Sequence, residues 1–326
     1  MKTRRRLSDL AHLVRAPAAL SVPGDVLAGA AAAGSPLNFR TFGVVGSSVC
    51  LYWAGMALND YADATIDAVE RPERPVPSGR VPRRTALAVA GGLTAAGLGL
   101  AAVTGGRRSL LGAVPLAGLV WAYDLGLKGT SAGPAAMAGA RAVDVLAGAL
   151  AADPGGRVGS VLRKGAGPAA LVGAHTYTLM ALSRHEMHGA PARLPARTLA
   201  ASTATAVAAA VPVVRRAARD MRGSGPGLTG QAAPRRAVAG ADAAWSTALV
   251  TVGATLAYLG TYGSAQLKAV RKPSGENVRK AVGSGVLALM PLQAALTARA
   301  GAPVAAAVLG FGHPLARRLA RRISPT

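Results

Sequence analysis

Apolar runs separated by short polar joints repeat along almost the whole chain. Alanine and glycine dominate the runs, and the charged residues gather in the joints between them. Runs such as 87–103, 109–123 and 241–263 approach or reach the roughly 17–25 residues that an α-helix needs to cross a bilayer. The pattern predicts an all-α integral membrane protein with about nine transmembrane helices. Their expected ranges are 10–33, 41–64, 85–104, 109–123, 133–151, 167–182, 197–214, 241–262 and 281–297. A last apolar segment, 302–312, either crosses the membrane or only dips into it.

The composition favours the same class. Of the 326 residues, 51% are hydrophobic and 16% are charged, whereas soluble domains carry about 25% charged residues. Small side chains let membrane helices approach closely, so a tightly packed bundle is expected. The alternative, a soluble helical protein rich in alanine and glycine, does not explain why the charges are confined to the joints.

The joint after the second run, 59–79, reads NDYADATIDAVERPERPVPSG. If the helix continues through this joint, its amide and acidic side chains fall within an arc of about 100°. These side chains are Asn59, Asp60, Asp63 and Asp67. Unpaired carboxylates so close together would repel one another, and an all-oxygen set of this kind suits Mg²⁺ held partly through phosphate oxygens. The alternative is a solvated helix end with mixed charges.

This joint resembles the first aspartate-rich motif of the UbiA superfamily of intramembrane prenyltransferases, N-D-x-x-D-x-x-x-D followed by an arginine and proline loop. Residues 59–67 match the motif without a gap, and Arg71-Pro72 and Arg74-Pro75 match its continuation. The resemblance implies one UbiA-like domain over 1–326, a helical bundle around a central cavity, and Mg²⁺ as cofactor. It also implies an isoprenyl diphosphate donor and a small aromatic or other electron-rich acceptor.

A second constellation, Tyr123-Asp124-x-x-x-Lys128, follows the fourth run and resembles the tyrosine and lysine signature of the family. In that interpretation Lys128 binds a diphosphate oxygen, and Tyr123 donates a hydrogen bond or faces a cation. The alternative is an interfacial tyrosine with a lysine that extends towards the headgroups, a common arrangement at membrane edges.

The joint 183–193 departs from the family, whose second aspartate-rich motif holds a second metal at this point. Here Glu186 is the only acid, and Arg184 lies near it. Three interpretations stay open: a weakly held metal, an arginine that neutralises diphosphate in place of a cation, or loss of the ionisation chemistry. His185 and His188 are three residues apart and could together bind a metal, but a third ligand is missing, so we interpret them as loop residues. Tyr177, the S-R-x-E junction and the tail PLARRLARRISPT resemble the EboC-like actinobacterial branch of the superfamily.

Ionisable residues also occur inside the runs, where they are energetically expensive and usually face a cavity. Arg141 and Asp144 are three residues apart, so a structural ion pair between them and a substrate-facing site both stay open. Arg15 and Asp25 are further inward-facing candidates, and His175 is interpreted as a core histidine.

Together these patterns predict a Mg²⁺-dependent membrane prenyltransferase. The expected catalytic residues are Asp60, Asp63, Asp67, Lys128 and Arg184. The expected substrate-binding residues are Asn59, Arg71, Arg74, Tyr123, Lys128, Arg184 and Glu186. The expected metal ligands are Asp60, Asp63, Asp67 and Glu186. The alternatives are a catalytically reduced homologue that binds or translocates a lipid-linked precursor, and a terpene cyclase of UbiA type.

The charge distribution bears on location and partners. The net charge of +23 lies in short loops rather than on one soluble face, so nucleic acid is not an expected partner. Lysine and arginine are more frequent in the joints on the side of the amino terminus and the acidic joint. This bias predicts a multi-pass protein of the cell membrane with its active-site loops in the cytoplasm. The single cysteine, Cys50, excludes a disulfide framework, and the oligomeric state is left open.

Overall fold

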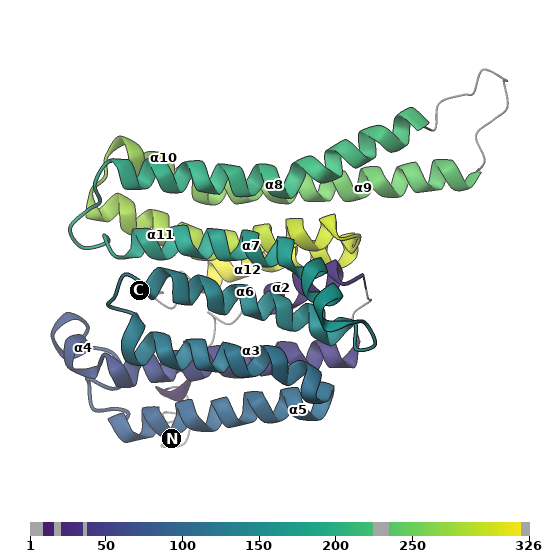
Figure 1. The fold of residues 1–326 in the computed structure, drawn as a ribbon. Helices are drawn as coiled ribbons and strands as arrows, with labels where there is room; N and C mark the ends of the chain where they lie inside the picture. The colour runs from purple at the N-terminus through teal and green to yellow at the C-terminus, as the bar shows by residue number, and fades with distance from the viewer. Residues whose placement is uncertain (1–8, 16–20, 35–37, 224–234, 321–326) are drawn as a thin grey trace, which may run out of the picture. The chain divides into compact units, whose positions relative to one another are not determined.

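The computed structural model describes residues 9–15, 21–34, 38–223 and 235–320, and this part of the chain contains helices and no strand (Figure 1). The chain divides into two compact units, which are described separately below. The first unit comprises Met1–Tyr177 with Ala316–Thr326, and the second comprises Thr178–Leu315. The single domain and the central cavity expected from the sequence stay predictions.

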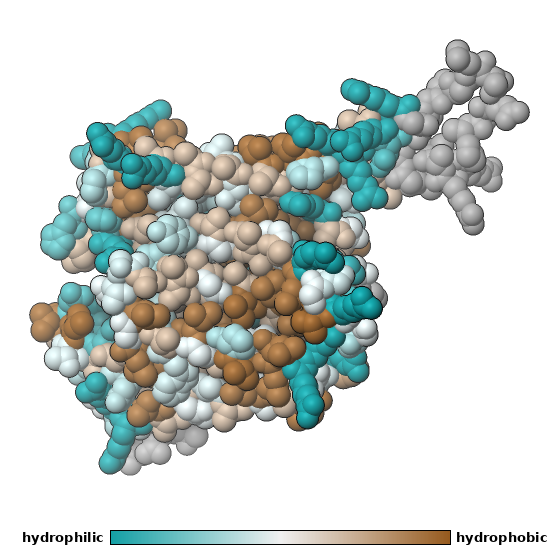
Figure 2. Space-filling model, viewed as in Figure 1, coloured by the Kyte–Doolittle hydropathy of each residue, from teal (hydrophilic) through white to brown (hydrophobic). Residues whose placement is uncertain are grey.

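Within the described residues, six helices are long and apolar enough to cross a membrane. They are Phe39–Ala62, Arg83–Leu127, Gly133–Ala152, Arg193–Arg222, Ala243–Arg271 and Gly275–Arg299. Figure 2 shows apolar and weakly polar side chains along the helices and hydrophilic ones gathered near their ends. The all-α membrane class is therefore confirmed, while the count of nine helices is not.

The first unit is built from α2 to α6 and most of α7. The bounds are α2 (Val22–Ala32), α3 (Phe39–Ala62), α4 (Ala64–Glu70), α5 (Arg83–Ala122), the π-helical turn η2 (Tyr123–Leu127), α6 (Gly133–Ala152) and α7 (Val158–Ser183). Helix α3 begins where Asn38 caps it, because the Asn38 side chain accepts hydrogen bonds from the backbone N–H groups of Arg40 and Thr41.

Helix α5 is a hairpin of two helices rather than one long rod. Its backbone breaks at Gly106, where φ is 59° and ψ is −148°, a conformation that glycine adopts readily. Trp121 Nε1 donates a hydrogen bond to Thr94 Oγ1 at 3.0 Å. In a straight helix these two residues would lie about 40 Å apart. The expected separate helices 85–104 and 109–123 are therefore confirmed.

Glycines bring the backbones of α2 and α6 into direct contact. A Cβ added to Gly29 would lie 1.7 Å from the carbonyl oxygen of Val145, and one added to Gly148 would lie 2.1 Å from that of Val26. Neither neighbour is a flexible side chain, so the two helices would have to separate. Small residues at such crossings are the usual means of close packing between membrane helices.

We expect Gly148→Ala to lower the free energy of unfolding by about 1–3 kcal/mol, because the added methyl group overpacks this crossing. Thermal unfolding in detergent measures the change. Gly99→Ala is the matched control, since a Cβ at Gly99 meets no atom within 4 Å. Equal unfolding temperatures for the two variants would contradict the close approach.

The second unit begins within α7 and ends within α12, at Leu315. The bounds are α8 (Arg193–Gly223), α9 (Arg235–Tyr258), the π-helical turn η3 (Leu259–Gly263), α10 (Ser264–Arg271), α11 (Gly275–Arg299) and α12 (Pro303–Ala320). Helices α8 and α9 pack through Val213, Ala217 and Ala248. Tyr258 and Tyr262 stack edge to face, with ring centroids 6.2 Å apart.

Several expected boundaries are wrong. The range 10–33 is not one helix: residues 9–13 are helical, a turn follows at 14–15, and α2 begins only at Val22. Helix α7 begins at Val158 rather than at 167. Helix α8 continues to Gly223, well past the expected end at 214. The apolar part of α12, Pro303–Gly312, is shorter than a membrane span, so the question of whether it crosses stays open.

Candidate active site at the end of α3

The acidic joint starts inside α3, continues through the short helix α4 and ends in the loop that follows α4. Helix α3 stops at Ala62, and α4 begins at Ala64. Between them Asp63 has φ −84° and ψ 2°, outside helical values. Helix α4 ends before Arg71, which adopts φ −147° and ψ 61° ahead of Pro72, outside the α region that is disfavoured for a residue before proline. The helix expected over 41–64 thus ends two residues early, and the helical geometry assumed for the arc from Asn59 to Asp67 is broken at Asp63.

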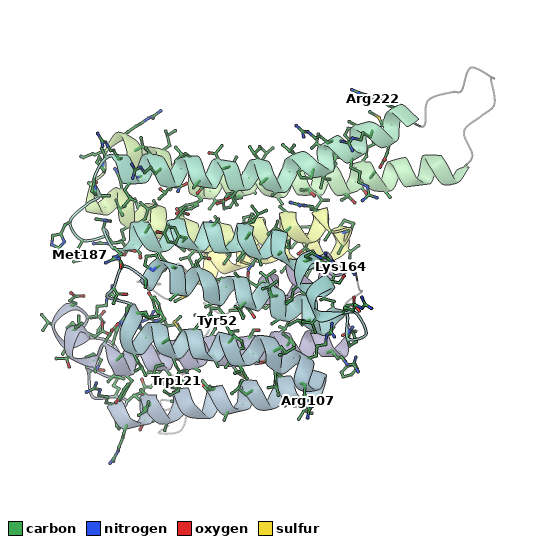
Figure 3. The ribbon with its side chains drawn as sticks, viewed as in Figure 1. Tyr52, Arg107, Trp121, Lys164, Met187 and Arg222 are labelled. Carbon is green, nitrogen blue, oxygen red and sulfur yellow. The ribbon has the colours of Figure 1, made fainter. Side chains whose placement is uncertain are left out.

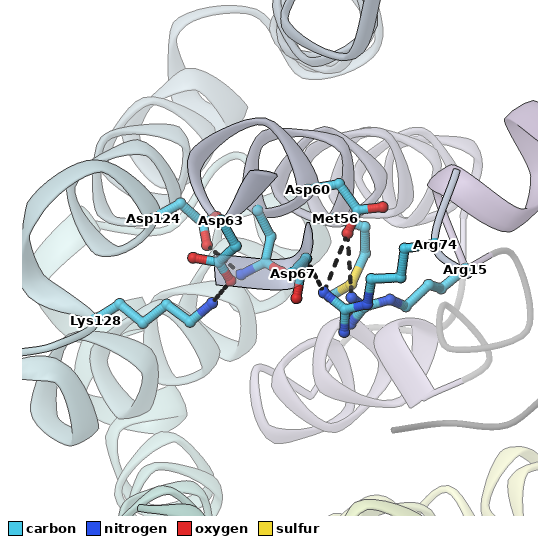
Figure 4. Close-up of polar contacts among 9 residues, drawn as sticks. Arg15, Met56, Asp60, Asp63, Asp67, Arg74, Asp124 and Lys128 are labelled. Atoms are coloured by element: carbon cyan, nitrogen blue, oxygen red, sulfur yellow. Dashed lines mark hydrogen bonds and ion pairs between the residues drawn. The ribbon is translucent and has the colours of Figure 1, made fainter. Parts of the chain in front are cut away.

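The three carboxylates form two groups that differ in their cationic partners. Arg74 lies between Asp60 and Asp67, with its Nη1 atom 2.5 Å from Asp67 Oδ2 and 3.6 Å from Asp60 Oδ1 (Figure 4). Both acids are only 2% exposed. Asp63 turns the other way and pairs with Lys128. Each carboxylate charge is thus matched by a neighbouring cation.

Arg74 is held in place by the proline-rich loop that carries it. Val76 and Val81 of this loop are buried in one apolar cluster with Leu13 and Leu58. The Ser78 hydroxyl donates to the carbonyl oxygen of Arg74 at 2.6 Å. The buried valines and this hydrogen bond therefore fix the loop that carries Arg74, and the sequence prediction that Arg74 belongs to this site is consistent with its geometry.

Arg15 is a member of the site that sequence reasoning did not assign. Its Nη2 atom lies 3.3 Å from Asp60 Oδ1, and its Nη1 atom donates to Met56 Sδ at 3.7 Å. Its φ of 44° is a left-handed conformation, which is costly for a residue other than glycine and often marks a functional position. Burial lowers the pKa of Arg15, and the cations of Arg74 and Arg71 lower it further. The sequence signal was an arginine at the start of the first apolar run.

The second half of α5 runs parallel to α3 in a fixed register. A Cβ at Gly55 would lie 2.9 Å from Val120 Cγ1, so the helices nearly touch at this point. Four residues further along each helix, Asn59 Nδ2 donates to Asp124 Oδ1 at 3.2 Å. Another four residues along, Lys128 pairs with Asp63. The signature after the fourth run is therefore brought to the acidic joint as the sequence predicted.

The π-helical turn η2 links this signature together. The backbone N–H of Lys128 donates to the carbonyl oxygen of Tyr123 at 2.9 Å, a bond between residues five apart. Such turns are rare and are frequent at functional sites. The Tyr123 side chain is buried, and its contact with substrate stays a prediction.

The donor chemistry of the joint fits a hard divalent cation. Asp60, Asp63 and Asp67 offer carboxylate oxygens and Asn59 an amide oxygen, which are ligands that Mg²⁺ prefers. In the part of the chain that the structure describes, no three acidic, histidine or cysteine side chains converge on one point. Instead, Arg15, Arg74 and Lys128 neutralise the carboxylates. The metal site formed by the three carboxylates thus stays a prediction. It requires that a metal ion displace these cationic side chains from the carboxylates.

The joint 183–193 lies in the second unit, where it packs on the loop between α10 and α11. The backbone N–H of Ala190 donates to the carbonyl oxygen of Pro273 at 3.1 Å. A Cβ at Gly275 would lie 2.8 Å from the carbonyl oxygens of both Glu186 and Met187, and Met187 is exposed (Figure 3). The roles expected for Arg184 and Glu186 stay predictions.

A buried ionic network lies between α2, α3 and α6. Arg141 pairs with Asp25, with its Nε atom 2.8 Å from Asp25 Oδ2, and its guanidinium carbon lies 5.1 Å from the centre of the Tyr52 ring. Asp144 instead accepts a hydrogen bond from Ser48 Oγ at 2.5 Å. Of the two possibilities left open for Arg141, a structural ion pair is present, but its partner is Asp25 of α2 rather than Asp144. The inward orientation expected for Asp25 is confirmed by its zero exposure, and His175 is likewise fully buried.

Comparison with known sequences identifies the family. The sequence model of the UbiA prenyltransferase family matches residues 22–216, more than half of the chain. The chain belongs to the UbiA prenyltransferase family. Members of this family are generally metal-dependent, and the apolar helices make this member a multi-pass membrane protein.

Two curated relatives of this chain carry the same name. The digeranylgeranylglyceryl phosphate synthase of Ignicoccus hospitalis is 37% identical over 168 residues, which cover 50% of this chain and 54% of the relative. The synthase of the same name from Methanopyrus kandleri is 47% identical over 87 residues, covering 27% of this chain and 31% of the relative. The chain thus spans about half, or less, of the length of these relatives. The EboC-like branch stays a prediction.

Two solved structures share the fold. A digeranylgeranylglyceryl phosphate synthase superposes with a TM-score of 0.56 at 15% identity, covering 90% of this chain and 98% of the other. A UbiA homologue from Aeropyrum pernix superposes with a TM-score of 0.52 at 19% identity, covering 83% and 96%. The UbiA fold expected from the acidic joint is confirmed.

Proposed function

We propose that this UbiA protein transfers an isoprenyl group from an isoprenyl diphosphate to a small acceptor within the membrane. The observation that carries the proposal is the joint of α3 and α4, where three carboxylates lie among Arg15, Arg74 and Lys128. Carboxylates can bind a metal ion, and cationic side chains beside them can bind the diphosphate. The proposed metal is Mg²⁺, and the proposed location of the joint is the cytoplasmic side of the cell membrane.

The acidic and the basic residues at the joint have different proposed roles. Asp60, Asp63 and Asp67 would hold Mg²⁺, with Asn59 as a neutral oxygen donor. Bound there, the metal supplies Lewis-acid stabilisation of the pyrophosphate leaving group. Arg74 and Lys128 would contact the diphosphate oxygens, on which negative charge grows as the allylic carbon–oxygen bond breaks. The proposed roles of Arg71, Tyr123, Arg184 and Glu186 are further contacts to substrate.

The name shared by the relatives suggests a first acceptor to test. A product with two geranylgeranyl groups on glyceryl phosphate implies transfer to a hydroxyl oxygen of a glyceryl phosphate that already carries one such group. In that reaction the allylic carbon–oxygen bond breaks with its electron pair leaving on pyrophosphate. The acceptor oxygen forms the new carbon–oxygen bond and loses its proton.

Purified protein in lipid nanodiscs, incubated with Mg²⁺ and labelled isoprenyl diphosphates of several lengths, tests the proposal. The expected result is pyrophosphate release with a prenylated acceptor as product, first with geranylgeranylglyceryl phosphate and then with aromatic acceptors. Binding without turnover would favour a catalytically reduced homologue that binds or translocates a lipid-linked precursor. The altered joint 183–193 is the feature that suggests this alternative. A hydrocarbon product formed without acceptor would indicate a cyclase.

We expect metal and diphosphate to bind cooperatively. A cation that binds Asp63 alone must displace Lys128, and a diphosphate that binds Lys128 alone must displace Asp63, since the two pair with each other. When both bind, Asp63 pairs with the cation and Lys128 pairs with the diphosphate, so neither side chain is left without a partner. Inorganic pyrophosphate should therefore raise the affinity for Mn²⁺ by about tenfold or more, as titration by electron paramagnetic resonance measures. An unchanged affinity would contradict this exchange.

A further inference from the structure

Asp124 contacts the acidic joint although neither the aspartate-rich motif nor the tyrosine and lysine pair requires it. Its Oδ1 atom accepts a hydrogen bond from Asn59 Nδ2 at 3.2 Å (Figure 4). The contact is specified by packing, because Gly55 and Val120 meet one turn earlier and set the register of the two helices. Lys128 and Asp63 meet one turn later. Asp124 is thus held opposite Asn59 from both sides.

This contact decides which edge of the Asn59 amide is available to a ligand. An ionised carboxylate only accepts hydrogen bonds, so the amide must turn its NH₂ group towards Asp124. The carbonyl oxygen then lies on the other edge of the planar amide. In the reverse orientation two acceptors would face each other, and the NH₂ group, which cannot bind a cation, would be presented instead.

We infer that Asp124 is a positioning residue that fixes the Asn59 amide so that its oxygen serves as a ligand for the divalent cation. The inference rests on the proposed function, because it concerns the metal of the same site. Partners one step removed from a metal commonly change its affinity by about 10–100-fold. Asp124 therefore contributes to metal binding without contacting the metal.

Mn²⁺ binding to the full chain in nanodiscs, with inorganic pyrophosphate present, tests this role by electron paramagnetic resonance. Asp124→Leu removes the acceptor, and we expect it to weaken Mn²⁺ binding about 10–100-fold. Asp124→Asn keeps a carbonyl acceptor at the same place, so binding should weaken by less than about threefold. Asp153→Leu, which removes an acid paired with Lys164, is the matched control and should leave binding unchanged.

Double variants separate positioning from simple loss of charge or fold. In an Asn59→Ala background Asp124 has nothing to orient, so adding Asp124→Leu should cause no further loss. The reciprocal exchange Asn59→Asp with Asp124→Asn keeps the hydrogen bond and an oxygen facing the cation, and should bind Mn²⁺ at least as tightly as the wild type.

The outcomes distinguish this inference from the proposed function. Absence of Mn²⁺ binding by the wild type would overturn both. Binding by the wild type with an equal affinity in Asp124→Leu would overturn the positioning role alone. The same holds for an additive loss in the Asn59→Ala background, or for loss of binding in the reciprocal exchange.

Discussion

Replacing Asp63 by alanine should lower the rate of pyrophosphate release by at least about 1,000-fold, because the change removes a proposed metal ligand together with the partner of Lys128. Asp63 lies at the break between α3 and α4. Pyrophosphate release from a labelled isoprenyl diphosphate, at saturating Mg²⁺, is the measurement.

Asp9→Ala is the matched control for this experiment. Asp9 also pairs with a basic residue of the loop, with its Oδ1 atom 3.0 Å from Arg80 Nη1, but it lies outside the group formed by Arg74 and the buried acids. We expect the Asp9 variant to keep most of the activity. Full activity in Asp63→Ala would defeat the assignment of the site.

Replacing Arg141 by alanine should lower the free energy of unfolding by about 3–5 kcal/mol, since it leaves the carboxylate of Asp25 buried without its cation. Asp25 has no exposed surface, and Arg141 is only 5% exposed. The guanidinium also donates to the carbonyl oxygen of Ser21 at 3.3 Å, so its loss removes two polar contacts made by α6 at the start of and within α2. Unfolding in a denaturing detergent titration measures the change.

Two further variants show whether the cost arises from the unpaired charge. Lys164→Ala removes an exposed partner of Asp153 and should cost less than about 1 kcal/mol. The double variant Asp25→Leu with Arg141→Met removes both charges, and it should be more stable than Arg141→Ala. A double variant as unstable as the single one would show that packing, and not charge, dominates at this place.

The sequence predicted the acidic joint well because its information is local. The spacing of Asn59, Asp60 and Asp63 places them on neighbouring faces of one helix end, whatever the rest of the fold does. Apolar runs likewise predicted α3 and α6 to within a few residues, because burial in a bilayer requires their length. The hairpin in α5 followed from the glycine and arginine pairs at 105–108.

Contacts between distant parts of the chain could not be predicted in this way. Arg15 reaches Asp60 across 45 residues of sequence, and Asp124 meets Asn59 only because Gly55 sets a helix register that no single segment specifies. Arg141 likewise pairs with Asp25 of α2 rather than with Asp144 of its own helix, because the packing of α2 on α6 brings Asp25 close. The boundary of α2 was missed because Pro23 lies in its first turn, where proline starts a helix rather than continues one.

The central claim is that the carboxylates at the end of α3 hold a metal together with a diphosphate. Electron–nuclear double resonance of Mn²⁺ with inorganic pyrophosphate detects phosphorus bound near the metal and tests this claim most directly. We expect a phosphorus coupling in the wild type that disappears when Asp60, Asp63 and Asp67 are all replaced by alanine. An equal coupling in the triple variant, or none in the wild type, would contradict it.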